Sequence, residues 1–131
     1  MTLRTGQKIS IETLNVELVE TALLRLGGSL STTTGQTEFR QLLDTLHPQI
    51  VAARVATFGV DVRSLNFVNS SAIRVFVDWI SKAAQARYKL AFRTDSAVTW
   101  HRLSFSVLKS LAPDTVDILD MRAVAAPGVS T

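Results

Sequence analysis

The sequence contains no cysteine, which excludes a disulfide framework, a thiolate metal site and a cysteine nucleophile. It has no apolar run near the roughly 18 residues that a membrane-spanning helix requires. Its N-terminal stretch, MTLRTGQKISIE, also lacks the apolar core of a signal peptide. These absences lead us to expect a protein of the cytoplasm.

Charge of one sign is not concentrated anywhere in the chain. There are 14 basic and 11 acidic residues, a net charge of +3, and the basic residues are scattered. Nucleic-acid-binding domains usually gather lysine and arginine in one patch, so we expect no nucleic-acid partner. Apolar residues make up 47% of the 131 residues, enough for one compact core. We predict a single domain over residues 1–131, with its core at about 12–120 and a short flexible tail at 122–131.

Familiar catalytic and ligand-binding motifs are also missing. Gly27 and Gly28 lack the further glycines of a nucleotide-binding loop, and no Gly-x-Ser-x-Gly elbow occurs. The two histidines, His47 and His101, have no partner at metal-ligand spacing, and we expect them at the surface or at helix ends. The sequence therefore predicts no cofactor, no metal site and no enzymatic activity. A small enzyme with a pocket that the sequence does not reveal stays open as an alternative.

The spacing of apolar residues predicts strands that alternate with helices. We expect strands at about 14–18, 22–26, 58–62, 89–93 and 116–119, and helices from 33, from 70 to 87, and from 95 or 96 to 112. Gly27-Gly28 is expected to end the second strand, Thr33 and Gln36 to form a capping box, and Pro48 to stop or bend the first helix. This order predicts an α/β domain with a mixed, mostly parallel sheet and helices packed against it.

The stretch LNFVNSSAIRVFVDW, residues 65–79, places two serines where a strand pattern gives way to a helix pattern. Backbone N–H groups in the first turn of a helix have no partner within the helix. Asn69 or Ser70 can cap these groups, which stabilises the helix by about 1 kcal/mol. A helix cap, and nothing more, is one complete interpretation of this turn.

A second interpretation makes the turn a phosphorylation site. A phosphoryl group on Ser70 would add a charge of about −1.5 to −2 and would meet the positive end of the helix macrodipole. The fold would carry that charge at modest cost, whereas a partner packed against the helix start would not. Ser70 is thus the candidate phosphoacceptor, with Asn69 and Ser71 as its neighbours in the turn.

The helix that follows suggests a partner surface. We place its core face at Ile73, Phe76, Val77, Ile80 and Ala84. Val75 and Trp79 then lie one turn apart on nearly the opposite side, where an apolar pair suggests contact with another protein. We predict a partner-binding surface at Arg74, Val75, Asp78 and Trp79. The alternative is that a neighbouring segment of the chain covers the apolar pair.

At these residues the sequence resembles a known family. FGVDVRSLNFVNSSAIRVFVDWI, residues 58–80, is similar to the central signature of STAS domains, specifically the bacterial anti-sigma factor antagonists. There, a strand with an aspartate leads into an Asp-Ser-Ser-Gly or Asp-Ser-Thr-Gly turn that begins the second helix. LLRLGGSLSTTTGQTEFRQLL and KLAFRTDSAVTWHRL resemble the family's flanking elements. The resemblance covers roughly residues 12–120 and implies the STAS fold.

The resemblance also implies a mechanism. The unphosphorylated antagonist binds a GHKL-type serine kinase that also serves as an anti-sigma factor, and phosphorylation of the turn releases it. A PP2C-type phosphatase then resets the cycle. Carried over to this chain, the phosphoacceptor is Ser70, and the protein is a regulator that switches partners rather than an enzyme.

Two positions depart from the family pattern. Asn69 stands in place of the aspartate, so one negative charge beside the acceptor is missing. Ala72 stands in place of the glycine, which suits a helix better but would hinder a partner that needs close backbone approach. An alternative therefore stays open: a STAS accessory or scaffold module, such as a subunit of a transporter or lipid-transfer system, that binds a partner without a phosphorylation cycle.

Overall fold

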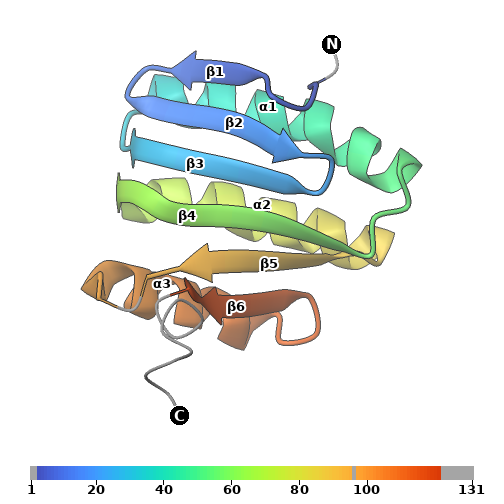
Figure 1. Cartoon of the computed structure of the whole chain (residues 1–131). Coiled ribbons are helices and arrows are strands. Elements are labelled where there is room, and N and C mark those ends of the chain that lie inside the picture. Colours follow the sequence, from blue (N-terminus) through green and yellow to red (C-terminus); the bar gives the residue numbers. More distant parts are fainter. Residues whose placement is uncertain (1–2, 96, 122–131) are drawn as a thin grey trace, which may run out of the picture.

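The computed structural model describes residues 3–95 and 97–121 and has one six-stranded sheet with helices packed against it (Figure 1). In chain order the elements are β1 Lys8–Ile11, β2 Leu14–Glu20, β3 Leu23–Leu30, α1 Thr33–Ala52, β4 Thr57–Val68, α2 Ser70–Ala86, β5 Lys89–Thr94, α3 Thr99–Leu111 and β6 Val116–Asp120. The predicted α/β class is confirmed. The predicted tail at 122–131 lies outside the described residues, and β1 is a strand that the sequence analysis missed.

The strands lie in the sheet in the same order as in the chain, β1-β2-β3-β4-β5-β6. β1, β2 and β3 pair antiparallel, and β3, β4, β5 and β6 pair parallel. Crossovers between parallel strands are right-handed, and each of these steps moves in one direction across the sheet. The helices therefore lie on the same face, behind the sheet in Figure 1. The other face carries none of the described helices.

Aromatic rings join the helices to the sheet in the core. The ring of Phe76 in α2 lies 5.7 Å from Phe39 of α1, 6.0 Å from Phe92 of β5 and 6.1 Å from Phe105 of α3, measured between centroids. All four rings are fully buried. Edge-to-face contacts of this kind stabilise beyond the burial of area alone. They fix α2, and with it the serine turn, against the rest of the molecule.

One predicted break in secondary structure was wrong, and of the two effects expected at Pro48, a stop or a bend, the stop is excluded. β3 does not end at Gly27-Gly28 but continues to Leu30, because Gly28 adopts φ +83° in the strand close to the backbone of Thr13. A Cβ at Gly28 would lie 2.0 Å from the Thr13 carbonyl oxygen, so only glycine fits. Pro48 does not stop α1, which continues to Ala52.

The start of α1 also differs from the predicted capping box by one residue. Thr32, not Thr33, is the N-cap, and its hydroxyl oxygen accepts a hydrogen bond from the N–H of Gly35 at 2.9 Å. The Gln36 side chain is consequently not used at the start of its own helix. It reaches instead to the start of α2.

No helix among residues 3–95 and 97–121 is long and apolar enough to cross a membrane.

Candidate functional site: the serine turn

The serine turn lies where β4 ends and α2 begins. Asn69 is the N-cap of α2, and its extended backbone turns the chain from the strand into the helix. Its side-chain Oδ1 accepts a hydrogen bond from the N–H of Ala72 at 2.9 Å. Ser70 is the first residue of the helix and is exposed. The capping interpretation is therefore correct for Asn69, and it leaves the Ser70 hydroxyl without a capping role.

Asn69 also ties the turn to the end of β3. Its Nδ2 donates a hydrogen bond to the carbonyl oxygen of Ser31 at 2.9 Å, and its backbone N–H donates to the carbonyl of Leu30 at 3.2 Å. An aspartate at this position could cap the helix but could not donate to the Ser31 carbonyl. Asparagine at this position therefore makes a contact that an aspartate could not make.

The two serines of the turn differ in their hydrogen bonds. Ser71 Oγ donates to Asn69 Oδ1 at 3.2 Å and accepts from Gln36 Nε2 at 3.1 Å. Gln36 Nε2 also lies 3.2 Å from Asn69 Oδ1, so this amide from α1 holds both residues. The Ser70 hydroxyl makes no hydrogen bond to any residue that the structure describes. It is the hydroxyl of the turn that is both exposed and unengaged.

A buried histidine anchors the neighbouring helix to the same end of the sheet. His101, in α3, is fully buried, and its Nε2 lies 2.9 Å from the carbonyl oxygen of Leu65 in β4. Its Nδ1 faces the N–H of Asp95 at 3.4 Å, so Nδ1 accepts and Nε2 carries the proton. Of the two places expected for His101, the surface was wrong and a helix end was correct, since His101 is buried in the first turn of α3 and links that helix to the strand that leads into the turn.

The predicted partner surface is partly wrong. Val75 and Trp79 are 1% and 2% exposed, because the buried face of α2 is rotated from the predicted one. That face consists of Ala72, Val75, Phe76, Trp79, Ile80 and Ala83. The alternative, that the chain itself covers Val75 and Trp79, is correct, since α1 and the sheet pack over them. Arg74 and Asp78 are exposed, and Asp78 forms an ion pair with Arg40 of α1.

Trp79 takes part in a buried polar chain at the far end of α2. Its Nε1–H donates to the Tyr88 hydroxyl oxygen at 3.0 Å, and that hydroxyl lies 2.7 Å from Nδ1 of His47. Burial raises the pKa of Tyr88, against the opposing effect of the Trp79 hydrogen bond. Burial, together with the charge of Lys82, lowers the pKa of His47, so the neutral ring can accept the Tyr88 proton in a hydrogen bond.

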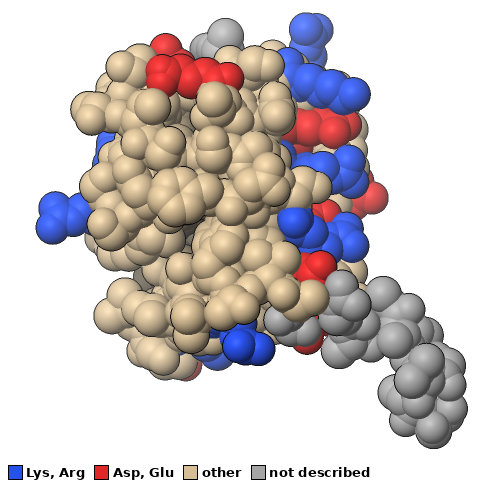
Figure 2. All heavy atoms as spheres, turned by 90° about the vertical axis from the view of Figure 1, so that its left-hand side faces the viewer, with Lys and Arg blue, Asp and Glu red and all other residues tan. Residues whose placement is uncertain are grey.

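The surface around the serine turn is poor in charge. Residues 29–37 and 64–73, which contain the ends of β3 and β4 and the starts of α1 and α2, include no Asp, Glu, Lys or Arg. Figure 2 shows this end of the sheet as a largely uncharged expanse, with most charged side chains at its margins. Phe67, near the end of β4, is 51% exposed there, and Leu103 of α3 is 62% exposed. Such a surface suits contact with another protein.

Sequence reasoning missed Gln36 and Phe67 as residues of this site. Gln36 was assigned to its own helix, and its contact with Ser71 depends on how α1 and α2 pack. Phe67 lies in the strand pattern, where an aromatic residue is usually taken as core. No local signal marks it, because Leu65, Asn66 and Phe67 alternate apolar and polar as in a half-buried strand, whereas the structure leaves both Asn66 and Phe67 exposed.

Comparison with known proteins defines the fold. No protein-family model matches the sequence, and no curated protein sequence matches it. Among solved structures, an anti-sigma factor antagonist from Mycobacterium paratuberculosis superimposes with a TM-score of 0.52 at 11% identity, over 86% of this chain and 84% of that one. The anti-sigma factor antagonist SpoIIAA in its unphosphorylated form superimposes with a TM-score of 0.53 at 13% identity, over 86% of this chain and 94% of that one.

The chain therefore has the STAS fold, as the resemblance at the serine turn predicted. At this level of identity the likeness concerns the arrangement of strands and helices.

Proposed function

We propose that the protein is a phosphorylation-switched binding regulator of the anti-sigma factor antagonist type, with no enzymatic activity of its own. Unphosphorylated, it binds a GHKL-type serine kinase that acts as an anti-sigma factor, and phosphorylation of Ser70 releases it. A PP2C-type phosphatase restores the binding form. The observation that carries the proposal is that Ser70 presents an exposed, unengaged hydroxyl at the start of α2, in a surface of low charge.

The proposed reaction transfers one phosphoryl group. The γ-phosphoryl of ATP passes to Ser70 Oγ, ADP leaves, and a base of the kinase accepts the hydroxyl proton. Because Ser71 is held by Asn69 and Gln36, Ser70 is the better placed of the two hydroxyls. The product charge lies at the positive end of α2, so the fold tolerates it.

The partner surface follows from the same geometry. Since Val75 and Trp79 are buried, contact with the kinase is left to exposed groups near the turn. We assign this role to Ser70, Ser71, Arg74 and Phe67, with Asp78 at its margin. A phosphoryl group on Ser70 would place a strong negative charge where a neutral hydroxyl had made the contact, and the complex would dissociate.

The test is to incubate the purified chain with ATP and each GHKL-type kinase of its source organism, followed by intact-mass measurement and site mapping. We expect one phosphoryl group on the wild type, none on Ser70→Ala, and one on Ser71→Ala. Phosphate that persists in Ser70→Ala would contradict the assignment of Ser70.

One observation favours a second function. The side chain of Asn69 is neutral, and both its amide groups make hydrogen bonds within the fold. This suits a STAS accessory or scaffold module that binds a partner without turning over phosphate. The same experiment separates the two. Absence of phosphate with every kinase, together with stable binding to one of them or to a transporter subunit, would support the scaffold and overturn the switch.

A further inference from the structure

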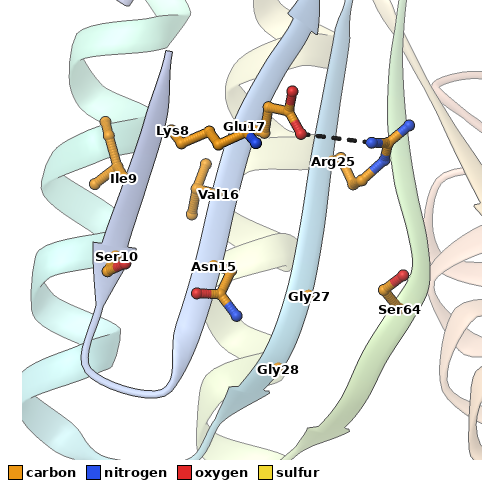
Figure 3. A pocket seen from close by; sticks show the side chains of 10 residues that line it. All are labelled: Lys8, Ile9, Ser10, Asn15, Val16, Glu17, Arg25, Gly27, Gly28 and Ser64. Atoms are coloured by element: carbon orange, nitrogen blue, oxygen red, sulfur yellow. Dashed lines mark hydrogen bonds and ion pairs between the residues drawn. The ribbon is translucent and has the colours of Figure 1, made fainter. Parts of the chain in front are cut away.

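The face of the sheet opposite the helices carries a groove that the serine turn does not use. The groove has a volume of about 420 Å³ and lies over β1, β2, β3 and β4 (Figure 3). Its lining includes Lys8, Ser10, Asn15, Arg25, Gly27 and Ser64. It is hollow because Gly27 has no side chain and its neighbours in the sheet are small or polar.

Strand register arranges the lining into two parallel rows. One row runs Ser10–Asn15–Gly27–Ser64 across the four strands and forms the floor. The adjacent row runs Lys8–Glu17–Arg25–Asp61–Arg93 and forms a charged wall. Strands are about 4.8 Å apart, so the floor is roughly 14 Å long, about the length of four residues of extended chain.

The wall has more positive charge than negative charge available to a ligand. The carboxylate of Asp61 is buried, with its residue 3% exposed, and Arg63 binds both its oxygens at 3.0 and 2.8 Å. Arg25 lies 3.4 Å from Glu17, its half-buried partner. Lys8 is exposed and has no ion pair with any residue that the structure describes. Figure 2 shows basic and acidic side chains gathered along one margin, where the open sheet face is seen edge-on.

We propose that this groove binds an extended acidic segment of a partner protein. Lys8 and the arginines of the wall would pair with its carboxylates, and Ser10, Asn15 and Ser64 would meet its backbone amides and carbonyls. Two features favour an extended peptide: the groove crosses several strands, and its floor offers hydroxyl and amide side chains that can both donate and accept hydrogen bonds. This surface is distinct from the serine turn, and its use does not depend on phosphorylation of Ser70.

The test uses the full chain and a short fluorescein-labelled peptide of alternating glutamate and serine, with binding measured by fluorescence anisotropy. We expect saturable binding that weakens as salt rises, since exposed charges are screened. Lys8→Glu reverses a charge of the wall at an edge strand without removing a described ion pair. The affinity of this variant for the peptide is expected to fall about tenfold, through both slower association and faster dissociation.

A second variant tests the groove itself. Gly27→Val fills the floor, and the added Cβ meets Ser64 at an ordinary 3.4 Å, so the strand can keep its place. We expect its affinity to fall about tenfold as well, because the peptide can no longer reach the floor. Arg102→Glu, an equal charge reversal on the exposed side of α3, is the matched control, and Ser70→Ala reports on the serine turn. Both should bind the peptide like the wild type.

Three results would overturn the proposal. The first is no saturable binding of the peptide by the wild type. The second is an equal loss in Lys8→Glu and Arg102→Glu, which would mean attraction to net charge only. The third is tighter binding of a single-stranded oligothymidylate than of the peptide, lost in Lys8→Glu, which would make the surface a nucleic-acid site.

Discussion

At the scale of single residues, the serine turn works through a division of roles. Asn69 caps α2 and ties it to β3, Gln36 holds Ser71, and Ser70 is left exposed. An asparagine can do all of this because it has both a donor and an acceptor in its side chain. The identity of the proposed phosphoacceptor is thus set by which hydroxyl its neighbours leave unbound.

Gln36 offers a direct test of this division. In Gln36→Met the amide is lost with little change in volume, so Ser71 loses one of its two partners. We expect the kinase to phosphorylate Ser71 as well as Ser70, as measured by mass-spectrometric site mapping. Gln41→Met, an exposed substitution in the same helix, is the control and should keep phosphorylation on Ser70 alone. Phosphate confined to Ser70 in Gln36→Met would show that the amide does not restrain Ser71.

Tyr88 gives a prediction about stability. Tyr88→Phe keeps the ring but leaves Nε1 of Trp79 and Nδ1 of His47 without their hydrogen-bond partner. We expect the free energy of unfolding to fall by about 1–3 kcal/mol, because a buried donor left unpaired keeps its desolvation cost. Unfolding in urea measures this free energy. A decrease below about 0.5 kcal/mol would mean that water reaches the two nitrogen atoms and replaces the lost partner.

At the scale of elements, the sequence predicted the type of most helices and strands but not how their faces are rotated. The wheel for α2 put Val75 and Trp79 outside because Ile73, Val77 and Ala84 formed an equally apolar stripe. Packing against α1 and the sheet decided between two stripes that periodicity could not rank. β1 was missed because KISI is short, and the continuation of β3 through Gly28 depends on the close approach of Thr13, which no local pattern reveals.

The Asp61–Arg63 pair in β4 predicts how stability depends on pH. Burial alone would raise the pKa of Asp61, but the hydrogen bonds from Arg63 and the charges of Arg63 and Arg25 outweigh it and hold the pKa below its usual value. A lowered carboxyl pKa contributes stability above the unfolded-state value of about 3.9, and this contribution is lost as pH falls through the folded-state pKa. The folded protein should therefore lose stability in acid partly through this group.

The measurement is the free energy of unfolding in urea at a series of pH values. Asp61→Asn should show a shallower loss below about pH 4 than the wild type does. Asp117→Asn removes a more exposed carboxylate from the same sheet and is the control, with a pH profile close to the wild type. Equal slopes in Asp61→Asn and the wild type would mean that other carboxylates govern acid unfolding.

At the scale of the whole molecule, the three crossovers place the helices on one side and leave two other surfaces free. One is the charge-poor end of the sheet with the serine turn, and the other is the charged open face with the groove. The STAS fold could be predicted from the sequence because the serine turn and the order of strands and helices are both visible in short stretches of the chain. The groove was not, since it exists only when four strands bring Ser10, Asn15, Gly27 and Ser64 into one row.

Ser70→Asp tests whether the uncharged end acts as a binding surface. The new carboxylate lies at the start of α2, so the free energy of unfolding should stay within about 0.5 kcal/mol of the wild type. Affinity for the kinase, measured by isothermal titration calorimetry, should fall by about tenfold or more. Ser81→Asp, on the exposed side of the same helix and away from the turn, should bind like the wild type. A large loss of stability in Ser70→Asp would mean that Ser70 is structural.

The neutral amide at Asn69 affects how much phosphorylation changes the charge of the turn. A turn that begins with aspartate is already anionic before any modification, so a phosphoryl group only deepens an existing polarity. Here the side chains of residues 69–71 carry no charge at rest, so a phosphoryl group would be the first charged group in the turn. A partner that distinguishes the two states would therefore respond to a change from a neutral to an anionic side chain at position 70.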